Sequence, residues 1–523
     1  MPNRLHKICA VLLLPMLLAS AGEAFAQVWH YQRRNEVENI QSVSASPVAI
    51  SGNPVVDWHA AQAAWNYERG DFHRPDSPSG KSELDLGVEE LSTLGKIRTS
   101  GSLRYRNIRD FARNWNSLIG NDPDNPYIIC DTLSDNSTTE RFDLKGSLVW
   151  SFAPGWLAAG SVGLTTATLS DIKDPRPRND ISRIPLSIGL QRDLGSKWVL
   201  GFFGGAELFR SDFKYYLEDG QKAYRYYKMM GMGEFFAFSS SDSYSAPREY
   251  SGLTWSGGIN ALLRGQRFSN FTELVFCSGN ENGRDGGSAY EWKSGDYSFM
   301  QFGFLDRIDI PGTLRHSISI RAGVKLRNGY WYDQKRMVDT EHGNIVYYEI
   351  KSRFLNNDAM RLVASADYCL GRETSWSAKI EASFCSENIT HFADGDPCDQ
   401  SWTTLDINAE AWKTIAVGRN ILDVSAGAGY VLPLGEAIYA SGNTAPAAQD
   451  ISKWYVAPAF AYETSGKLSA YCRADWVFAP MKGRRPGLFV KGSILKQMGS
   501  APQCPSLEGT SFYGLSAGAV LTF

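Results

Sequence analysis

The sequence lacks long hydrophobic runs and an excess of either charge. Among its 523 residues, no stretch after residue 26 reaches the ~18 unbroken apolar residues that a membrane helix needs. The formal net charge is −3, which excludes a dominant surface for nucleic acid or another polyanion. The chain also has no GxSxG, HExxH or phosphate-binding glycine motif. We therefore predict no enzyme, no catalytic residues, no cofactor and no nucleic-acid partner.

Cysteine is scarce, and its spacing fits no zinc or CxxC site. Cys385 and Cys398 flank the segment 386–397 symmetrically, so they are a candidate disulfide if that segment is a hairpin loop. The alternative is that cysteines serve as small apolar residues in strands, as at Cys277. His391 lies in the same predicted outer loop, with Glu387, Asp394 and Asp396 nearby. A solvated loop explains this group better than a metal site does, and we predict no metal.

The N-terminus has the three parts of a secretory signal peptide. A short basic region ends at Lys7, an apolar core runs over 8–19, and Ala24-Phe25-Ala26 forms a cleavage pattern. Cleavage is expected between Ala26 and Gln27. We divide the chain into a signal peptide (1–26), an N-terminal periplasmic lead-in (27–60) and a β-barrel (61–523).

Apolar and polar residues alternate with a strict period of two after Gly312. The even positions of LRHSISIRAGVKLR, from Leu314 to Leu326, are mostly apolar, whereas the odd positions are polar, small or basic. Similar alternation occurs around 142–152, 376–384, 405–410 and 422–428. Aromatic residues make up 12 % of the chain, which suits the two interfacial girdles of a membrane barrel. A soluble β-propeller or tandem sandwich is the rival fold, but its strands are more often apolar on both faces.

Glycine marks a regular series of short turns, because it accepts the positive φ that tight hairpins demand. Successive turns are 40 to 70 residues apart, which fits two strands and one longer polar loop. Eight turns give nine hairpins, or about 18 strands (range 14–20). We predict a transmembrane antiparallel up-and-down β-barrel with short periplasmic turns and long extracellular loops. The turn glycines are Gly95, Gly155, Gly195, Gly265, Gly312, Gly371, Gly418 and Gly466.

The last strand ends the chain on an assembly signal. Ser516, Gly518, Leu521 and Phe523 occupy the polar, glycine, apolar and terminal aromatic places of the signal of outer-membrane barrels. A strand edge with one apolar face can add to the sheet of an insertion machine. The barrel-assembly machinery and outer-membrane lipid of a Gram-negative bacterium are therefore the expected partners. We expect this strand to close the barrel against the first strand, near 65–72.

The stretch 63–107 includes Trp65-Asn66-Tyr67, Gly70-Asp71-Phe72, Leu94-Gly95-Lys96 and GSLRY at 101–105. In these features the chain resembles the large, uncharacterised outer-membrane barrels of Bacteroidota, grouped as a family of unknown function. The resemblance implies a fold and a location, and it implies no catalytic residues.

Two groups of residues are candidates for binding or lumen selectivity. The first is a basic stripe, Arg315, Arg321, Lys325 and Arg327, to which Arg98, Arg104 and Arg106 are candidate additions. The alternative is that these cations only neutralise carboxylates inside the barrel; the candidate partners are Asp367, Glu381, Asp406, Glu410 and Asp475.

The second group is an aromatic and methionine-rich loop, 215–249, whose composition suits an interface. It either constricts the lumen, docks a partner, or packs against neighbouring loops. Its candidate residues are Tyr224, Tyr226, Tyr227, Phe235 and Phe236.

The leading functional hypothesis is a passive channel or transport-associated barrel for small solutes, because 18 strands enclose an aqueous lumen unless loops fill it. The alternative is a closed binding or scaffold barrel beside a surface lipoprotein, a receptor or a secretion complex. An outer-membrane hydrolase ranks lowest, because no nucleophile–base pair is visible.

Overall fold

The computed structural model describes residues 39–54, 57–219, 222–240, 247–286, 292–341, 343–372, 375–393, 396–442, 450–481 and 483–523. The predicted signal peptide and its cleavage site at Ala26–Gln27 lie outside the described residues. In the described ranges, no helix is long and apolar enough to cross a membrane.

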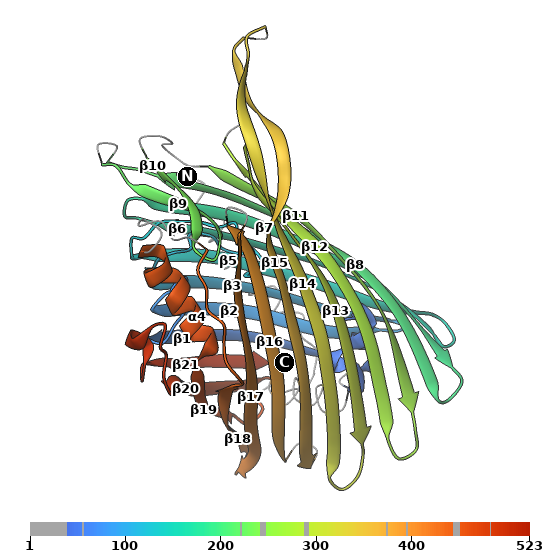
Figure 1. Cartoon of the computed structure of the whole chain (residues 1–523). Helices are drawn as coiled ribbons and strands as arrows, with labels where there is room; N and C mark the ends of the chain where they lie inside the picture. The colour runs from blue at the N-terminus through green and yellow to red at the C-terminus, as the bar shows by residue number, and fades with distance from the viewer. Residues whose placement is uncertain are drawn as a thin grey trace.

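Eighteen long strands form one antiparallel sheet that closes on itself (Figure 1). Strands that follow one another around the sheet pair along nearly their full length, and β1 pairs with both β2 and β21. The predicted all-β fold with about 18 strands is confirmed. The strands are β1 (Trp58–Gly70), β2 (Gly80–Leu94), β3 (Ile97–Arg113), β5 (Asp135–Ala153), β6 (Trp156–Asp171), β7 (Arg176–Leu194), β8 (Trp198–Tyr216), β11 (Arg248–Arg264), β12 (Ser269–Asp285), β13 (Trp292–Ile310), β14 (Arg315–Asp339), β15 (Ile345–Arg372), β16 (Trp376–Ala393), β17 (Asp396–Val417), β18 (Asn420–Pro433), β19 (Gly466–Val477), β20 (Arg485–Met498) and β21 (Ser511–Thr522).

The barrel closes where the last strand meets the first, as the sequence predicts. In the β1–β21 register, Trp65 lies opposite Ala517 and Gly70 opposite Phe512. The terminal Phe523 ring stacks on His59 at 5.7 Å between centroids. Within the barrel, closure leaves no sheet edge, so the strands there can satisfy their backbone hydrogen bonds within the sheet.

The two faces of the sheet differ in polarity. Outward side chains are large, apolar and exposed, such as Ile188 at 72 % and Phe202 at 58 %. Inward positions carry buried polar groups, such as Asp85, Asn260 and Glu273. An apolar exterior around a polar interior is the arrangement by which barrels of the outer membrane sit in lipid. The chain is therefore an outer-membrane β-barrel.

The short connections gather at one end of the barrel. Gly95, Gly155, Gly195 and Gly418 adopt φ between +62° and +70° in such turns. The predicted turn at Gly466 is wrong, because this residue begins β19 after a long loop and forms no tight turn. The eighth short connection runs from β19 to β20 over 478–484 and contains Gly483 at φ +78°.

The opposite end carries the longer connections and the remaining elements. These are β4 (Ile129–Cys130), β9 (Arg225–Gly231), β10 (Glu234–Ser239), the π-helical turn η3 (Ser452–Val456), α4 (Ala457–Thr464) and the 3-10 turn η4 (Pro505–Leu507). Three connections at this end are short as well, namely β6–β7 (172–175), β14–β15 (340–344) and β16–β17 (394–395). The β14–β15 hairpin rises well clear of the barrel (Figure 1). Beyond Tyr330 and before Asn357 its two strands pair only with each other.

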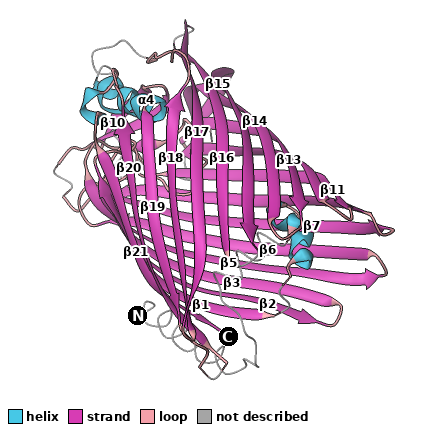
Figure 2. Ribbon diagram, turned by 90° about the horizontal axis from the view of Figure 1, so that it is seen from below, coloured by secondary structure: helices cyan, strands magenta, loops and turns pink. Residues whose placement is uncertain are grey.

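Two 3-10 turns of the N-terminal segment, η1 (Ile40–Val43) and η2 (Pro47–Gly52), lie against the inner wall. Gln41 Nε2 donates to Gln191 Oε1 at 3.1 Å, and Ala45 N donates to Glu273 Oε1 at 2.9 Å. Figure 2 shows these turns beside β7 and apart from α4. The described part of the predicted lead-in, residues 39–54, thus lies inside the short-turn end of the barrel.

The candidate disulfide is also wrong. The segment 386–397 is mostly strand, so β16 and β17 continue past both cysteines. Cys385 lies opposite Thr404, whereas Cys398 lies opposite His391 six positions further along β16. Both thiols are free.

We predict that Gly518→Val blocks closure of the barrel. A Cβ at Gly518 would lie 2.6 Å from the Ala63 carbonyl oxygen and 2.5 Å from the Phe489 ring. The Ala63 oxygen belongs to the backbone of β1 and cannot move without shifting that strand, so the clash costs more than the roughly 1–3 kcal/mol of ordinary overpacking. Gly492→Val is the matched control, because a Cβ there meets nothing within 4 Å. Heat-modifiable mobility on a denaturing gel measures folding: the control should fold and Gly518→Val should not. Equal folding of both variants would contradict the packing account.

Candidate functional site

Three segments from the loop end fold back over the lumen, and we call them together the lumen cap. They are residues 114–134, 222–240 and 450–465. Strand β9 pairs antiparallel with both β10 and β4, so a three-stranded sheet joins the first two segments. Figure 1 shows β9, β10 and α4 at the same end of the barrel. Segments far apart in sequence therefore form one structure.

The aromatic residues predicted to form an interface lie mostly inside the cap. Tyr226 is fully buried, and its ring stacks on Tyr215 at 4.1 Å. Tyr224 packs against the same cluster. Tyr227 and Phe235 contact each other at 5.4 Å and pack against a second cluster around Trp115.

Phe236 differs from the other candidate aromatics, because it is 49 % exposed and contacts Trp292 at 5.7 Å. Four of the five aromatics thus hold the cap together, and one lies at its surface.

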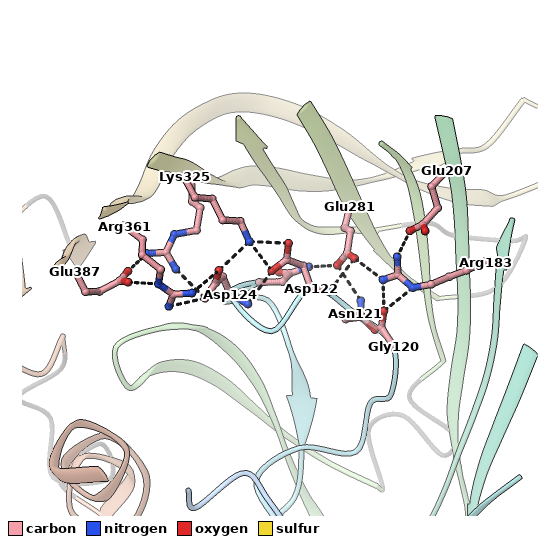
Figure 3. A network of polar contacts seen from close by, with 12 residues as sticks. Gly120, Asn121, Asp122, Asp124, Arg183, Glu207, Glu281, Lys325, Arg361 and Glu387 are labelled. Atoms are coloured by element: carbon pink, nitrogen blue, oxygen red, sulfur yellow. Dashed lines mark hydrogen bonds and ion pairs between the residues drawn. The ribbon is translucent and has the colours of Figure 1, made fainter. Parts of the chain in front are cut away.

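Ion pairs fix the cap to the barrel wall (Figure 3). Lys325 Nζ lies 3.0 Å from an Asp122 carboxylate oxygen and 2.8 Å from one of Asp124. Arg327 Nη1 and Arg361 Nη2 lie 2.9 Å and 3.1 Å from Asp124. Both arginines also pair with Glu387. Two loop carboxylates thus bind three cations of β14 and β15.

A wall carboxylate holds the same loop from its other side. Glu281 on β12 accepts hydrogen bonds from the Asp122 backbone N at 2.9 Å and from Asn125 Nδ2 at 2.9 Å. Arg183 on β7 donates from Nε to the Gly120 carbonyl at 3.1 Å and also pairs with Glu207. The loop 114–134 is therefore anchored to the part of the wall that runs from β7 to β15.

The electrostatics of Asp124 favour the ionised form. Burial alone would raise the pKa of this carboxyl, but Arg327, Arg361 and Lys325 outweigh burial and lower the pKa below its usual value. A lowered pKa keeps Asp124 charged at neutral pH, so the ion pairs persist there.

All four residues of the predicted basic stripe make ion pairs. Arg315 Nη2 lies 3.2 Å from Asp309, and Arg321 Nη1 lies 2.9 Å from Asp367. The additional candidates Arg104 and Arg106 pair with Asp85 and Asp143, and Arg98 donates to the Ser51 carbonyl. Of the five carboxylates proposed as partners, Asp367 binds the stripe, whereas Glu381 and Asp475 bind Lys379 and Arg473.

Sequence reasoning missed Asp122 and Asp124, the loop partners of the stripe. The available signal was the run Asn121-Asp122-Pro123-Asp124-Asn125-Pro126, in which two prolines restrict a doubly acidic loop. Nothing in that run indicates which wall it would contact.

His391 lies in strand β16 and is fully buried, not in a solvated loop. Its Nδ1 is 2.9 Å from Asn357 Oδ1 and its Nε2 is 2.7 Å from Glu234 Oε2, so it ties the β9–β10 hairpin to the wall. Glu387 instead binds the arginines, and Asp394 lies outside the described residues. Across the described ranges, no three His, Cys, Asp or Glu side chains are grouped to hold a metal ion.

Two cavities remain beside the cap, on the wall where the barrel closes. One of about 610 Å³ is lined by Glu68, Lys81, Arg113 and Phe512 among others. The second, of about 370 Å³, is lined by Gln62, Ala64 and Asn66 of β1 with residues of β2, β3 and β19–β21. Since Asn66 and Glu68 are successive inward positions of β1, the two cavities are stacked along one inner wall.

We predict that Asp131→Asn stabilises the cap at neutral pH but not in acid. Asp131 is buried and accepts hydrogen bonds from Leu133 N at 2.8 Å and Tyr215 Oη at 3.2 Å. Burial raises its pKa from the usual 3.8 to about 6. The folded protein therefore binds the proton more tightly than the unfolded chain, and stability falls as pH rises from about 4 to about 6.

Asparagine keeps an acceptor oxygen without the charge. The variant should gain stability at about pH 7.5, by about 3 kcal/mol at most, and should match the parent near pH 4. Thermal unfolding in detergent at the two pH values measures this difference. If the variant and the parent differ in stability by the same amount at both pH values, the raised pKa of Asp131 is refuted.

Comparison with known proteins gives a family but no function. No curated protein sequence matches the chain. Solved structures with similar folds include BauA, the ferric preacinetobactin receptor from Acinetobacter baumannii (9 % identity, TM-score 0.40, 89 % of this chain and 80 % of that one). They also include the RagAB peptide transporter (6 %, 0.41, 89 % and 86 %) and the ferric-catecholate import receptor Fiu from E. coli K12 (8 %, 0.40, 89 % and 81 %).

At these identities and TM-scores the similarities say nothing about what this barrel carries. The predicted origin in Bacteroidota stays a prediction. A family model matches residues 47–523, which span the barrel and the second half of the N-terminal segment 39–54, including η2. The chain therefore belongs to the family of unknown function DUF6850.

Proposed function

We propose that this barrel is a transport-associated channel that passes small solutes along one side of its lumen, and that it is not an enzyme. The observation that carries the proposal is the pair of stacked cavities that share the inner face of β1–β3, β20 and β21. The smaller extends to β19, and the larger extends to β5–β7 and the cap. An 18-stranded barrel is wide enough for an aqueous lumen unless protein fills it.

Two groups of described residues cover other parts of the inner wall. The cap contacts β7, β12 and β14–β16 at the loop end, through Arg183, Glu281, Lys325, Arg361 and His391. Residues 39–54 contact β3, β5–β7, β12 and β13 at the short-turn end. At the closing wall the covers make fewer contacts. Phe72 after β1 packs against Ala461 and Tyr462 of the cap, and Arg98 of β3 donates to the Ser51 carbonyl. The two cavities lie beside these contacts, so a solute path there requires no rearrangement of the sheet.

In this proposal the basic stripe positions the cap and does not contact solute directly. Lys325 and Arg327 form ion pairs with Asp122 and Asp124, and Arg321 pairs with Asp367. The width of the channel then depends on whether the loop 114–134 stays bound.

Removing the loop charges should widen the channel. In Asp122→Asn/Asp124→Asn, Lys325, Arg327 and Arg361 lose their loop partners. Breaking a buried ion pair from one side costs about 3–5 kcal/mol, so the loop should detach. Planar-bilayer recording should show a conductance above that of the parent.

The control for this experiment is Asp212→Asn, which removes an exposed carboxylate that pairs with Arg210 at 3.1 Å. This control should conduct like the parent. Absence of conductance from all three proteins would contradict the channel, and equal conductance of all three would contradict the role of the cap.

The projecting hairpin favours a second candidate function, docking of a surface lipoprotein. An isolated two-stranded ribbon is marginally stable in water, and its unpaired edges invite another chain. Large apolar side chains are exposed on it, namely Val338, Ile345, Tyr347, Ile350 and Phe354.

Shortening the hairpin tests the second candidate without disturbing the barrel. Replacement of residues 333–352 by Asn-Gly joins Tyr332 to Arg353, which already lie opposite each other. Cross-linking in native outer membranes, with identification by mass spectrometry, should lose one lipoprotein while the barrel stays heat-modifiable. An unchanged set of cross-linked proteins would exclude docking at this hairpin.

A further inference from the structure

The smaller cavity lies at the seam where the barrel closes. It has a volume of about 370 Å³, within the range of pockets that hold small molecules. Its wall is formed mostly by inward residues of the first three and the last three strands. The charged residues in this wall are Asp85, Arg104, Arg473, Asp475, Arg485 and Lys491.

Both carboxylates in this wall already have cationic partners. Asp85 binds the Arg104 guanidinium through two oxygens, with Nε at 2.7 Å from Oδ1. Asp475 binds Arg473 in the same way, at 2.8 Å and 2.6 Å. Neither carboxylate is left to neutralise another cation.

The other two cations have no such partner among the described residues. Arg485 Nε is buried and has no hydrogen-bond acceptor there. Lys491 makes no ion pair with a described residue, and its Nζ lies 5.0 Å from the centroid of the Tyr471 ring. Four cations against two carboxylates leave the wall with a charge of 4 − 2 = +2.

The register adds a second observation. Lys491 lies directly opposite Arg473 in the β19–β20 pair. Like charges placed opposite each other on neighbouring strands destabilise a sheet. An anion between them would relieve that repulsion and would give the Arg485 guanidinium an acceptor, since guanidinium geometry matches carboxylate and phosphate oxygens.

We propose that this cavity is a binding site for small oxyanions, carboxylates or phosphates, held by Arg485 and Lys491 with help from Arg473. The proposal rests on the proposed channel for its purpose, because an anion bound on the solute path makes the channel prefer anions. The site itself is a property of the folded barrel and is testable without any current.

The first experiment measures binding of inorganic phosphate to purified barrel by broadening of its ³¹P resonance. The parent should broaden the signal, and Arg485→Glu/Lys491→Glu should not. Arg485→Gln/Lys491→Gln removes the two positive charges without adding negative ones, so it is less disruptive to folding. It should also fail to bind phosphate. The control is Lys335→Glu/Arg336→Glu, which makes the same change of charge on the projecting hairpin and should bind like the parent.

The second experiment measures the reversal potential in a potassium chloride gradient. The parent and the hairpin control should favour chloride. The Arg485→Glu/Lys491→Glu variant should lower the chloride-to-potassium permeability ratio by about fivefold or more.

The results separate the two proposals. Phosphate binding that is absent from the parent, or unchanged in both charge variants, overturns the oxyanion site. Phosphate binding that follows the prediction, in a barrel that never conducts, supports the site and overturns the channel.

Discussion

Closure of the sheet is the constraint on which the rest of the structure depends. In lipid, an unpaired strand edge would leave backbone groups without hydrogen-bond partners, so β1 must meet β21. That pairing places the terminal Phe523 ring on His59 and brings the two ends of the barrel domain to the short-turn end. Once the barrel is closed, inward side chains have only water, each other or folded-back loops as partners. The inner surface is polar for this reason, and so carries charges that loop carboxylates can bind.

The division of the lumen follows from where those charges lie. The cations of β14 and β15 attract Asp122 and Asp124, which draw the loop 114–134 to one side of the barrel. Glu281 and Arg183 hold the loop along its length, and pairing of β4 with β9 brings a second loop with it. The N-terminal turns η1 and η2 cover the same part of the circumference at the opposite end, through Gln191 and Glu273. The closing wall borders both cavities and carries Arg485 and Lys491, which have no carboxylate partner among the described residues.

The barrel could be predicted from the sequence because the alternation of apolar and polar residues and the turn glycines are local features of each hairpin. The alternation from Leu314 to Leu326 gives the faces of β14, and the four turn glycines with positive φ mark real hairpins. The prediction at Gly466 failed because a glycine just after the end of a helix, here α4, cannot be told from a hairpin glycine by sequence alone. Phe512 and Val520 break the inward polar pattern of β21, since they pack against the buried clusters around Phe72 and around Trp58.

The cap depends on contacts between distant parts of the sequence. The Asp124–Lys325 contact joins positions 201 residues apart, and the His391–Glu234 contact joins positions 157 residues apart. No local periodicity records such pairs, so the cap was not predictable from sequence.

In the proposed channel, solute moves along the closing wall and not along the basic stripe. Cysteine accessibility in a background without the native cysteines tests it most directly. Asn66→Cys lies between the two cavities on β1, whereas Ser319→Cys occupies a buried inward position on β14. A charged methanethiosulfonate reagent should block the current through Asn66→Cys and leave that through Ser319→Cys unchanged. Block at Ser319→Cys with none at Asn66→Cys would contradict the account.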